Sequence, residues 1–281
     1  MNTVSIGVFG GSGFTGLELT NLLARHSGVR VVAVTSDRWV GEGVRGLPGL
    51  KYIGHDEGAQ TRVDIALLAT PAESSLKLVP ALLAKGTRVI DLSGAFRLKD
   101  PALYPAYYGF THPHPELLQE AVYGLPELQR ATARLVANPG CYATAAAMAI
   151  RPLIAASAID PNGIVVTAAS GVSGASRKAS EEYSFMEIEG DFRAYKVLGH
   201  QHTPEIAQTA GVKELVFIPH LLPMQRGILC TTVATVKGDP ASVLRDAYAK
   251  EPLVKLLPSA DQVRLAHAAR TPYCLIGATT R

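Results

Sequence analysis

Short apolar runs alternate with amphipathic segments through the first half of the chain. The apolar runs have the length and β-branched content of buried strands, and the segments between them repeat apolar residues at helical spacing. The strand candidates are residues 4–9, 29–34, 64–69 and 88–92, and the helix candidates are residues 17–24 and 72–83. Because repeated strand–helix–strand units build parallel sheets with helices on both faces, this half predicts a doubly wound α/β sheet.

The pattern changes from about residue 151, where strand candidates outnumber helix candidates. Strands are predicted over residues 165–169, 215–219, 228–236 and 263–267, and a helix over residues 241–250. This mixture is typical of a second α/β domain, with a larger mixed sheet than the first. We expect a dinucleotide-binding domain over residues 1–140 and a catalytic domain over residues 141–281.

A glycine-rich turn follows the first strand candidate. It lies between that strand and the first helix candidate, and a second strand comes next, which is the context of the Rossmann dinucleotide fingerprint. Glycines let the backbone approach a pyrophosphate, and the helix N-terminus donates N–H groups to it. The predicted cofactor contacts in this turn are Gly11, Ser12, Gly13, Phe14, Thr15 and Gly16.

The end of the second strand candidate carries the residues that discriminate between cofactors. Asp37 is placed to hold a ribose 2′-OH, which indicates NAD. Ser36 and Arg38 are instead suited to a 2′-phosphate, which indicates NADP. Ser36 and Arg38 lead us to predict NADP, although the negative charge of Asp37 would repel a 2′-phosphate.

Two further turns follow strand candidates and are expected at the same edge of the sheet. Thr70 and Pro71 follow the third strand, and Ser93 follows the fourth. Ligands of such sheets bind outside the carboxyl ends of the strands, so these three residues are also candidate cofactor contacts.

Cys141 stands where an apolar strand candidate, residues 133–137, gives way to a helix candidate. Residues 138–140 are Asn-Pro-Gly, a turn, and the alanine-rich residues 145–150 are strong helix formers. A thiol in the first turn of a helix meets the positive end of the helix dipole and free N–H groups, which lower the pKa of a cysteine. Cys141 is therefore a candidate nucleophile; the alternative is a small buried residue.

Seven segments in the same order resemble the N-acetyl-gamma-glutamyl-phosphate reductase family of arginine biosynthesis. They are residues 10–16, 91–98, 123–127, 138–144, 170–175, 199–206 and 219–228. The resemblance covers nearly the whole chain. It implies NADPH-dependent reduction of an acyl phosphate to an aldehyde through a cysteine thioester, with a small-molecule substrate and a homo-oligomeric, dimerising enzyme.

The resemblance also suggests the remaining site residues. It places the catalytic histidine just before the predicted helix start at Thr203, where His202 is favoured and His200 is the rival; solvated loop histidines are the alternative. The suggested substrate contacts are Arg97, Asn138, Ser173, Gly174, Glu205 and Arg226.

The chain departs from the family in two places. Asp37 follows the Thr-Ser pair where members usually carry a basic residue. Members also continue past Arg281 with a strand, an Asp-Asn-Leu segment and a helix that returns to the first domain. The second departure puts the activity of this chain in question.

Composition argues against several classes of partner. A net charge of +3 is too small to indicate a nucleic-acid or membrane partner, and no apolar run reaches the roughly 18 residues that span a bilayer. The odd cysteine count, with no metal-ligand spacing, favours a reducing cytoplasm and no metal. Cys230 lies in an apolar strand candidate and is interpreted as an inert core residue. His112 and His114 are interpreted as part of a rigid loop.

Two alternatives to the arginine-pathway activity stay open. One is a relative with the same cysteine chemistry, either another semialdehyde dehydrogenase or an aminoadipyl phosphate reductase of lysine biosynthesis that takes its substrate from a carrier protein. The other is a nucleotide-sensing Rossmann protein without catalysis, which predicts an unreactive thiol at Cys141.

Overall fold

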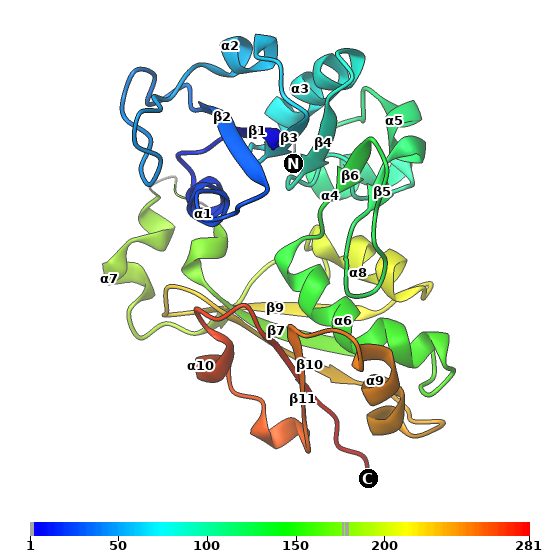
Figure 1. The fold of residues 1–281 in the computed structure, drawn as a ribbon. Helices are drawn as coiled ribbons and strands as arrows, with labels where there is room; N and C mark the ends of the chain where they lie inside the picture. The colour runs from blue at the N-terminus through cyan, green and yellow to red at the C-terminus, as the bar shows by residue number, and fades with distance from the viewer. Residues whose placement is uncertain (1–2, 176, 178–179) are drawn as a thin grey trace. The chain divides into compact units, whose positions relative to one another are not determined.

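The computed structural model describes residues 3–175, 177 and 180–281 (Figure 1). Its residues group into two compact units, Met1–Pro139 and Gly140–Arg281. No helix of the described chain combines the length and the apolar character that crossing a membrane requires.

The first unit is built on a parallel six-stranded sheet. Its strands are β1 (Val4–Phe9), β2 (Val29–Thr35), β3 (Ile65–Leu68), β4 (Arg88–Asp91), β5 (Val122–Tyr123) and β6 (Leu135–Ala137), in the order β2-β1-β3-β4-β6-β5. Every neighbouring pair is parallel. The carboxyl ends of β1 to β4 therefore share one edge, where the loops that follow them meet.

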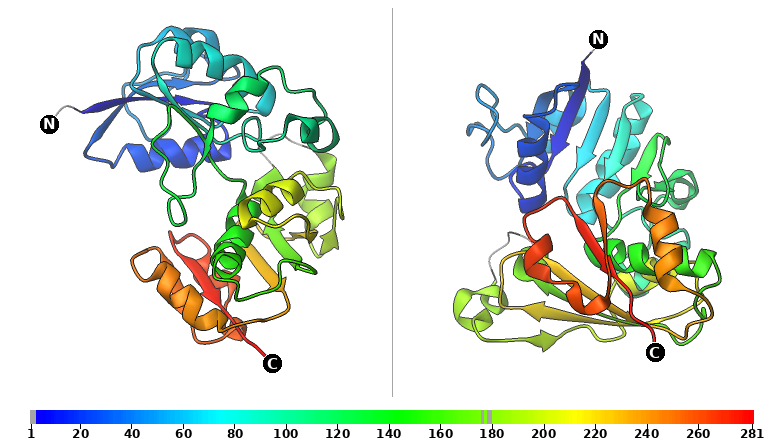
Figure 2. Two further views of the ribbon diagram at one scale, coloured as in Figure 1. Left: turned by 90° about the vertical axis from the view of Figure 1, so that its right-hand side faces the viewer. Right: turned by 60° about the horizontal axis from the view of Figure 1, so that its bottom comes forward.

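Helices cover both faces of this sheet, as predicted. They are α1 (Phe14–Leu23), α2 (His55–Gln60), α3 (Ala72–Ala84), α4 (Tyr104–Tyr108) and α5 (Pro115–Glu120), with the 3₁₀ turn η1 (Pro101–Leu103). Val8 packs with Leu19 of α1 on one face, whereas Phe9 packs with Leu82 of α3 on the other. This alternation follows from the period of two along a strand. The left view of Figure 2 shows α1 in blue on one side of the sheet and the cyan α3 on the other.

The second unit contains a mixed four-stranded sheet. Its strands are β7 (Val165–Gly171), β8 (Arg193–Ala194), β9 (Val216–Leu222) and β10 (Ile228–Val233), in the order β10-β7-β9-β8. β7 and β9 are parallel, and the two outer strands are antiparallel to their neighbours. The predicted mixed sheet is confirmed. The prediction that it is larger than the sheet of the first unit was wrong, since it has four strands against six. One of its strands, β8, has only two residues, and β11 and β12 form a separate two-stranded sheet.

Among the residues that the structure describes, the helices in the core of this mixed sheet pack on one face. On that face α6 (Cys141–Ala155) and α8 (His202–Ala210) bury Val166 and Phe217. On the opposite face Val165, Val216 and Val233 are in register across β7, β9 and β10. Val216 is 38% exposed and Val233 is 64% exposed, so an apolar sheet face is left open to solvent.

The remainder of the second unit corrects one prediction. It comprises α7 (Phe185–Ile188), α9 (Pro240–Tyr248), α10 (Leu265–Ala268), the parallel pair β11 (Val254–Leu257) and β12 (Cys274–Gly277), and the 3₁₀ turns η2 (Val172–Ala175), η3 (Glu181–Tyr183) and η4 (Ala260–Gln262). The strand predicted over residues 263–267 was wrong, since α10 occupies most of it. Alanines at 266, 268 and 269 favour helix, and most of the segment is exposed, so its alternating pattern does not line a sheet.

Candidate active site

The glycine-rich turn between β1 and α1 is closely packed at two of its glycines and open at a third. A Cβ atom on Gly11 would lie 2.2 Å from Val34 Cγ1, and one on Gly16 would lie 2.2 Å from the Gly10 carbonyl oxygen. A Cβ on Gly13, the N-cap of α1, would meet only the Gly10 carbonyl oxygen, at 3.5 Å. Gly11 and Gly16 are therefore required by packing, while Gly13 leaves space in front of the helix N-terminus, where a pyrophosphate is expected.

The end of β2 adds polar groups beside this turn. The hydroxyls of Ser12 and Ser36 lie 2.7 Å apart, which joins the glycine-rich turn to the residue after β2. The guanidinium of Arg38 lies 5.7 Å from the centre of the Trp39 ring, within cation–π range. Phe14 and Thr15, in the first turn of α1, are exposed.

Asp37 is bound by His55, the first residue of α2. Asp37 Oδ1 accepts a hydrogen bond from the His55 backbone N–H at 2.8 Å, and Asp37 Oδ2 lies 3.7 Å from His55 Nε2. The sequence patterns contained no sign of this pairing, because the two residues are 18 positions apart and on different elements.

A buried carboxylate joins the turns that follow β3 and β4. Asp91 is fully buried and accepts hydrogen bonds from Ser75 Oγ at 2.8 Å, Ser93 N at 3.1 Å and Ser93 Oγ at 2.8 Å. The Thr70 and Ser75 hydroxyls lie 2.8 Å apart. Burial raises the pKa of Asp91, and these hydrogen bonds oppose that shift. Thr70 and Ser93 thus belong to one hydrogen-bond network centred on Asp91. The sequence did not lead us to predict Asp91 as a site residue. A carboxylate at the end of an apolar strand was the sequence feature that could have indicated it. Pro71, beside Thr70, is the N-cap of α3.

Arg97 supports the backbone that precedes Cys141 in the chain. It is 8% exposed, and its Nε and Nη2 atoms donate to the carbonyl oxygens of Asn138 at 2.8 Å and Leu92 at 2.6 Å. The Asn138 side chain donates to the Pro139 carbonyl oxygen at 3.1 Å. These hydrogen bonds of Arg97 and Asn138 are with backbone atoms, as expected of residues that shape a turn.

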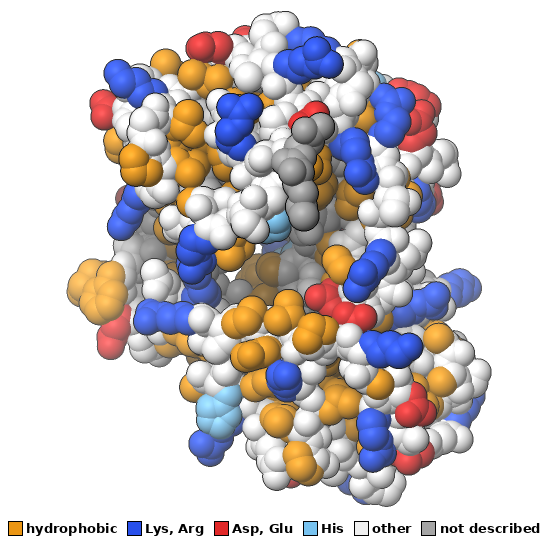
Figure 3. Space-filling model, in the orientation of Figure 1, with side chains coloured by type: hydrophobic (Ala, Val, Ile, Leu, Met, Phe, Trp, Pro, Cys, Tyr) orange, Lys and Arg blue, Asp and Glu red, His pale blue; other side chains and the backbone are white. Residues whose placement is uncertain are grey.

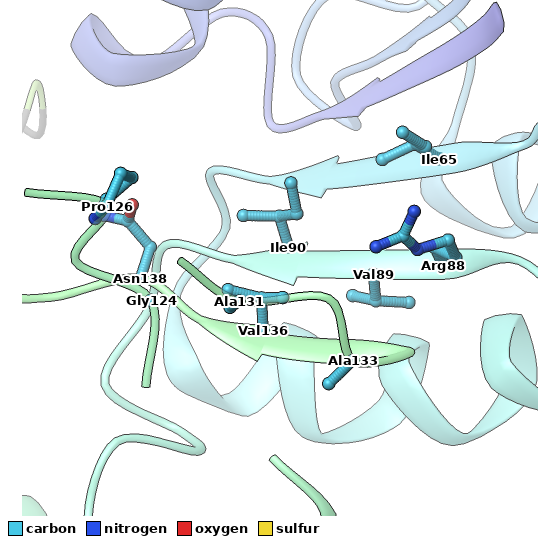
Figure 4. A pocket seen from close by; sticks show the side chains of 10 residues that line it. All are labelled: Ile65, Arg88, Val89, Ile90, Gly124, Pro126, Ala131, Ala133, Val136 and Asn138. Carbon is cyan, nitrogen blue, oxygen red and sulfur yellow. The ribbon is translucent and has the colours of Figure 1, made fainter. Parts of the chain in front are cut away.

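A pocket in the first unit lies beside strands β3, β4 and β6. It has a volume of about 220 Å³ and is lined by residues of β3, β4, β6 and the loop after β5 (Figure 4). Its lining residues are Ile65, Arg88, Val89, Ile90, Gly124, Pro126, Ala131, Ala133, Val136 and Asn138. Of the predicted site residues, only Asn138 lines it.

Cys141 is the first residue of α6. Gly140 is the N-cap, in extended conformation, and the Cys141 side chain is exposed while Tyr142 and Ala143 behind it are buried. The thiol therefore sits at the positive end of a 15-residue helix with access to solvent. A helix N-terminus favours a thiolate, so this environment suits a nucleophile.

Glu205 connects the start of α6 to the start of α8. It is fully buried, and its Oε1 atom accepts the Gly140 backbone N–H at 2.7 Å. Its Oε2 atom lies 3.8 Å from His202 Nε2. The structure thereby brings together the N-cap that precedes Cys141, the favoured histidine and a carboxylate predicted as a substrate contact.

His200 supports His202. Its Nδ1 atom accepts the His202 backbone N–H at 3.1 Å, and the ring centres lie 4.8 Å apart. Both histidines are buried. Desolvation, then the neighbouring His202 and Lys196, lower the pKa of His200 to about 3. At neutral pH His200 is therefore a neutral ring that accepts a backbone hydrogen bond.

Tyr142 forms an aromatic contact behind these histidines. Its ring lies edge-on to His200 and His202, and its hydroxyl donates to the His220 carbonyl oxygen at 3.0 Å. Tyr195 Oη lies 3.2 Å from Tyr142 Oη, and burial raises the pKa of Tyr142. Neither tyrosine was singled out from the sequence.

Ser173, Gly174 and Arg226 lie on two segments that run side by side. Ser173 and Gly174 are in η2, directly after β7, and the Ser173 N–H donates to the Gln225 carbonyl oxygen at 3.0 Å. A Cβ on Gly171 would lie 2.7 Å from the Arg226 backbone nitrogen. The tight packing of these backbones groups three of the predicted substrate residues.

Cys230 and His112, which were not predicted as site residues, both lie in the interior of their units. Burial raises the pKa of Cys230 to about 12, as expected of an inert core thiol. His112 is buried in an aromatic cluster, its Nε2 atom 2.8 Å from the Ala95 carbonyl oxygen. No group of three potential metal ligands occurs among the residues that the structure describes.

Charge is dispersed on the molecular face drawn in Figure 3. Lys and Arg side chains are scattered there among hydrophobic and acidic ones and do not gather into one patch.

Two family models together match almost the whole chain. Residues 5–136 match "Semialdehyde dehydrogenase, NAD binding domain", and residues 141–281 match "Semialdehyde dehydrogenase, dimerisation domain". The solved structures of aspartate semialdehyde dehydrogenase II from Vibrio cholerae, in complex with ASA, and of the Candida albicans enzyme with NADP have the same fold. The Vibrio cholerae structure has a TM-score of 0.71 at 17% identity and covers 95% of this chain and 85% of its own. The Candida albicans structure has a TM-score of 0.65 at 13% identity and covers 94% of this chain and 85% of its own.

Relatives much more similar in sequence carry one name, N-acetyl-gamma-glutamyl-phosphate reductase. The Laribacter hongkongensis relative is 43% identical, over 91% of this chain and 80% of its own length. The Dehalococcoides mccartyi relative is 42% identical, over 98% of this chain and 85% of its own length. With both domain models and these identities, the chain belongs to the N-acetyl-gamma-glutamyl-phosphate reductases, within the semialdehyde dehydrogenase family.

Proposed function

We propose that this chain reduces N-acetyl-L-glutamyl 5-phosphate to N-acetyl-L-glutamate 5-semialdehyde with NADPH, releasing inorganic phosphate, as a step of arginine biosynthesis. The observation that carries the proposal is the arrangement around Glu205, which holds both the N-cap of the Cys141 helix and His202. An exposed thiol at a helix N-terminus opposes the alternative of a nucleotide sensor with an inert cysteine. The names of the relatives favour an N-acetylglutamyl over an aminoadipyl acyl group.

The first half of the reaction is acyl transfer to Cys141. His202 takes the thiol proton, the sulfur attacks the acyl carbonyl carbon, and the carbon–oxygen bond to phosphate breaks. His202 then gives that proton to the departing phosphate. Glu205 is close enough to stabilise a protonated His202 by charge, since its Oε2 atom lies 3.8 Å from His202 Nε2.

The second half frees the aldehyde. The thioester carbonyl carbon would take up the hydride that a reduced nicotinamide supplies when it is bound. The carbon–sulfur bond then breaks, the aldehyde leaves, and Cys141 departs as the thiolate that the N-terminus of α6 favours; this thiolate takes up one proton from solvent before the next cycle. We assign the acid–base role to His202 rather than His200, because His200 has a pKa near 3 and its Nδ1 atom accepts a backbone hydrogen bond.

NADP is the proposed form of the cofactor. The Ser12 and Ser36 hydroxyls and the Arg38 guanidinium supply donors for a 2′-phosphate, and Asp37 is bound to His55. Space beside Gly13 supports the placement of the pyrophosphate at α1. Contacts from Thr70, Pro71 and Ser93 are proposed at the same sheet edge, and substrate contacts from Ser173, Gly174 and Arg226.

A homodimer is proposed to form through the open face of the mixed sheet. Val165, Val216 and Val233 lie in register there, and Leu229 on the same face is 36% exposed. Residues 141–281 match a dimerisation-domain model, which supports a second copy of the chain as the occupant of this face. The cytoplasm is proposed as the site of the reaction, on the ground of the odd cysteine count.

Leu229→Arg tests the proposed interface. A charge buried against a second copy is expected to convert the dimer to monomer in analytical ultracentrifugation, because an unpaired buried charge is costly. Leu22→Arg is the control, since Leu22 is 58% exposed on α1 and outside the proposed interface. A dimer that persists in Leu229→Arg contradicts this interface.

The reverse reaction tests the enzyme assignment. With N-acetylglutamate semialdehyde and phosphate, the chain is expected to reduce NADP, and Cys141→Ser is expected to lose at least about 10³-fold of this rate. Cys230→Ala is the matched control, because that thiol is held in the core with a pKa near 12. Phosphate-independent turnover, or turnover retained by Cys141→Ser, contradicts the proposed mechanism.

A further inference from the structure

The contact between Asp37 and His55 sits where the cofactor's 2′ position is expected. Asp37 lies two residues beyond β2, whose carboxyl end lies beside the glycine-rich turn, since the Gly11 N–H donates to the Thr35 carbonyl oxygen at 2.9 Å. The 2′ substituent of the adenosine ribose binds at this end of the second strand. A carboxylate free to turn toward a 2′-phosphate would repel it.

His55 holds that carboxylate at two points. Its backbone N–H donates to Asp37 Oδ1 at 2.8 Å, and its Nε2 atom lies 3.7 Å from Asp37 Oδ2. Asp37 itself is 68% exposed, so without His55 its side chain has few constraints on its rotamer, whereas the His55 side chain is only 18% exposed.

The ring of His55 is in turn fixed from the other side. Its Nδ1 atom lies 2.6 Å from Thr35 Oγ1, and Thr35 Oγ1 accepts the Gly10 N–H at 3.2 Å. The ring also stacks on Phe9, with centres 6.4 Å apart. A continuous set of contacts thus runs from the glycine-rich turn through Thr35 and His55 to Asp37.

We propose that His55 is a specificity-determining residue for the cofactor: it holds the Asp37 carboxylate at the start of α2 and leaves the 2′ position to Ser12, Ser36 and Arg38. The inference rests on the proposed preference for NADP. It explains how an acidic residue typical of NAD enzymes is compatible with a site for a 2′-phosphate. His55 acts here through Asp37 and is a positioning residue.

Trp39 gives a direct readout of this site. It is the single tryptophan of the chain, it is 40% exposed, and its ring lies beside Arg38. Its fluorescence is therefore expected to change when an adenosine phosphate binds. Titration with 2′,5′-ADP and with 5′-AMP isolates the contribution of the 2′-phosphate without hydride transfer.

His55→Ala is expected to reduce the affinity ratio of 2′,5′-ADP over 5′-AMP by about threefold to fivefold. The range corresponds to loss of one partly exposed polar side-chain contact, because the backbone N–H of residue 55 still holds Oδ1. Asp37→Asn alone is expected to leave the ratio near that of the unsubstituted protein. Asp37→Asn combined with His55→Ala is expected to restore it, because the released side chain is then uncharged.

His26→Ala is the matched control. His26 also lies in the first unit, but before β2, at the opposite end of that strand. Thermal unfolding of each variant identifies any general loss of folding. If the unsubstituted protein shows no preference for 2′,5′-ADP, the proposed NADP preference fails. If the preference exists but His55→Ala matches His26→Ala, or the double variant does not recover, the role of His55 is refuted.

Discussion

The cofactor site and the thiol site of this chain are assembled in different ways. The glycine-rich turn takes its main residues from positions 10–16, so strand, turn and helix N-terminus are adjacent along the chain. The thiol site joins Gly140 to Glu205 across 65 positions and adds a second helix start at His202. Both use a helix N-terminus, but the phosphate contact proposed for the first depends on backbone geometry, whereas the second site depends on side chains placed by tertiary packing.

The difference teaches which changes each site tolerates. In the glycine-rich turn, steric space determines which substitutions are tolerated. An added methyl group is a large perturbation there, because a Cβ on Gly16 would lie 2.2 Å from a backbone oxygen. In the thiol site, charge and hydrogen bonding decide, and an isosteric substitution is the informative change. Each of the following predictions breaks one site while leaving the other intact, or separates two similar residues within a site.

The largest effect is expected for His202→Asn. Loss of general acid–base chemistry is expected to lower kcat by about 10²- to 10⁴-fold. Binding of 2′,5′-ADP, followed by Trp39 fluorescence, should stay unchanged because that site lies in the first unit. His200→Asn is the comparison variant, with a smaller loss; equal losses in the two variants would remove the distinction between base and positioning residue.

Gly13→Ala is expected to affect only the cofactor site. The new Cβ meets nothing closer than the Gly10 carbonyl oxygen at 3.5 Å, so the fold should tolerate it, but the methyl group occupies the space proposed for the pyrophosphate. We expect NADPH affinity to fall by about tenfold, from an overpacking cost of about 1–3 kcal/mol. The pH dependence of iodoacetamide labelling at Cys141 should match that of the unsubstituted protein. Unchanged NADPH affinity would place the pyrophosphate elsewhere.

A separate effect, on folding rather than on ligand binding or turnover, is expected in the pH dependence of stability. The folded-state pKa of His200 lies near 3, below its ordinary value of 6.5, so the unfolded chain binds more protons between these values. Stability from this group is fully present above about pH 6.5 and is lost as the pH falls toward 3, by at most about 1.4 kcal/mol per pH unit. The slope of unfolding free energy against pH should therefore be lower in His200→Gln; identical slopes would contradict a neutral buried His200.

Site residues that depend on local sequence patterns could be predicted, whereas those that depend on tertiary contacts could not. Gly11, Gly13 and Gly16 could be assigned from spacing, because a turn between a strand and a helix depends on neighbours in the chain. Asp91 and His55 could not, since their partners Ser75 and Asp37 come from separate elements brought together only by the sheet edge. The strand predicted over residues 263–267 failed because alternation implies a strand only where a sheet provides a buried face.

The amino-acid sequence by itself determined the alternation of elements, the glycine-rich turn, the helix that begins at Cys141 and the family. These depend on periodicity, on backbone preferences and on motif order, all of which act over short separations. Tertiary structure decided that Glu205 reaches both Gly140 and His202, that His200 is held neutral, and that Asp37 is bound by His55. Burial and the pairing of distant polar groups arise only when the sheets and helices pack, because desolvation depends on every neighbour at once.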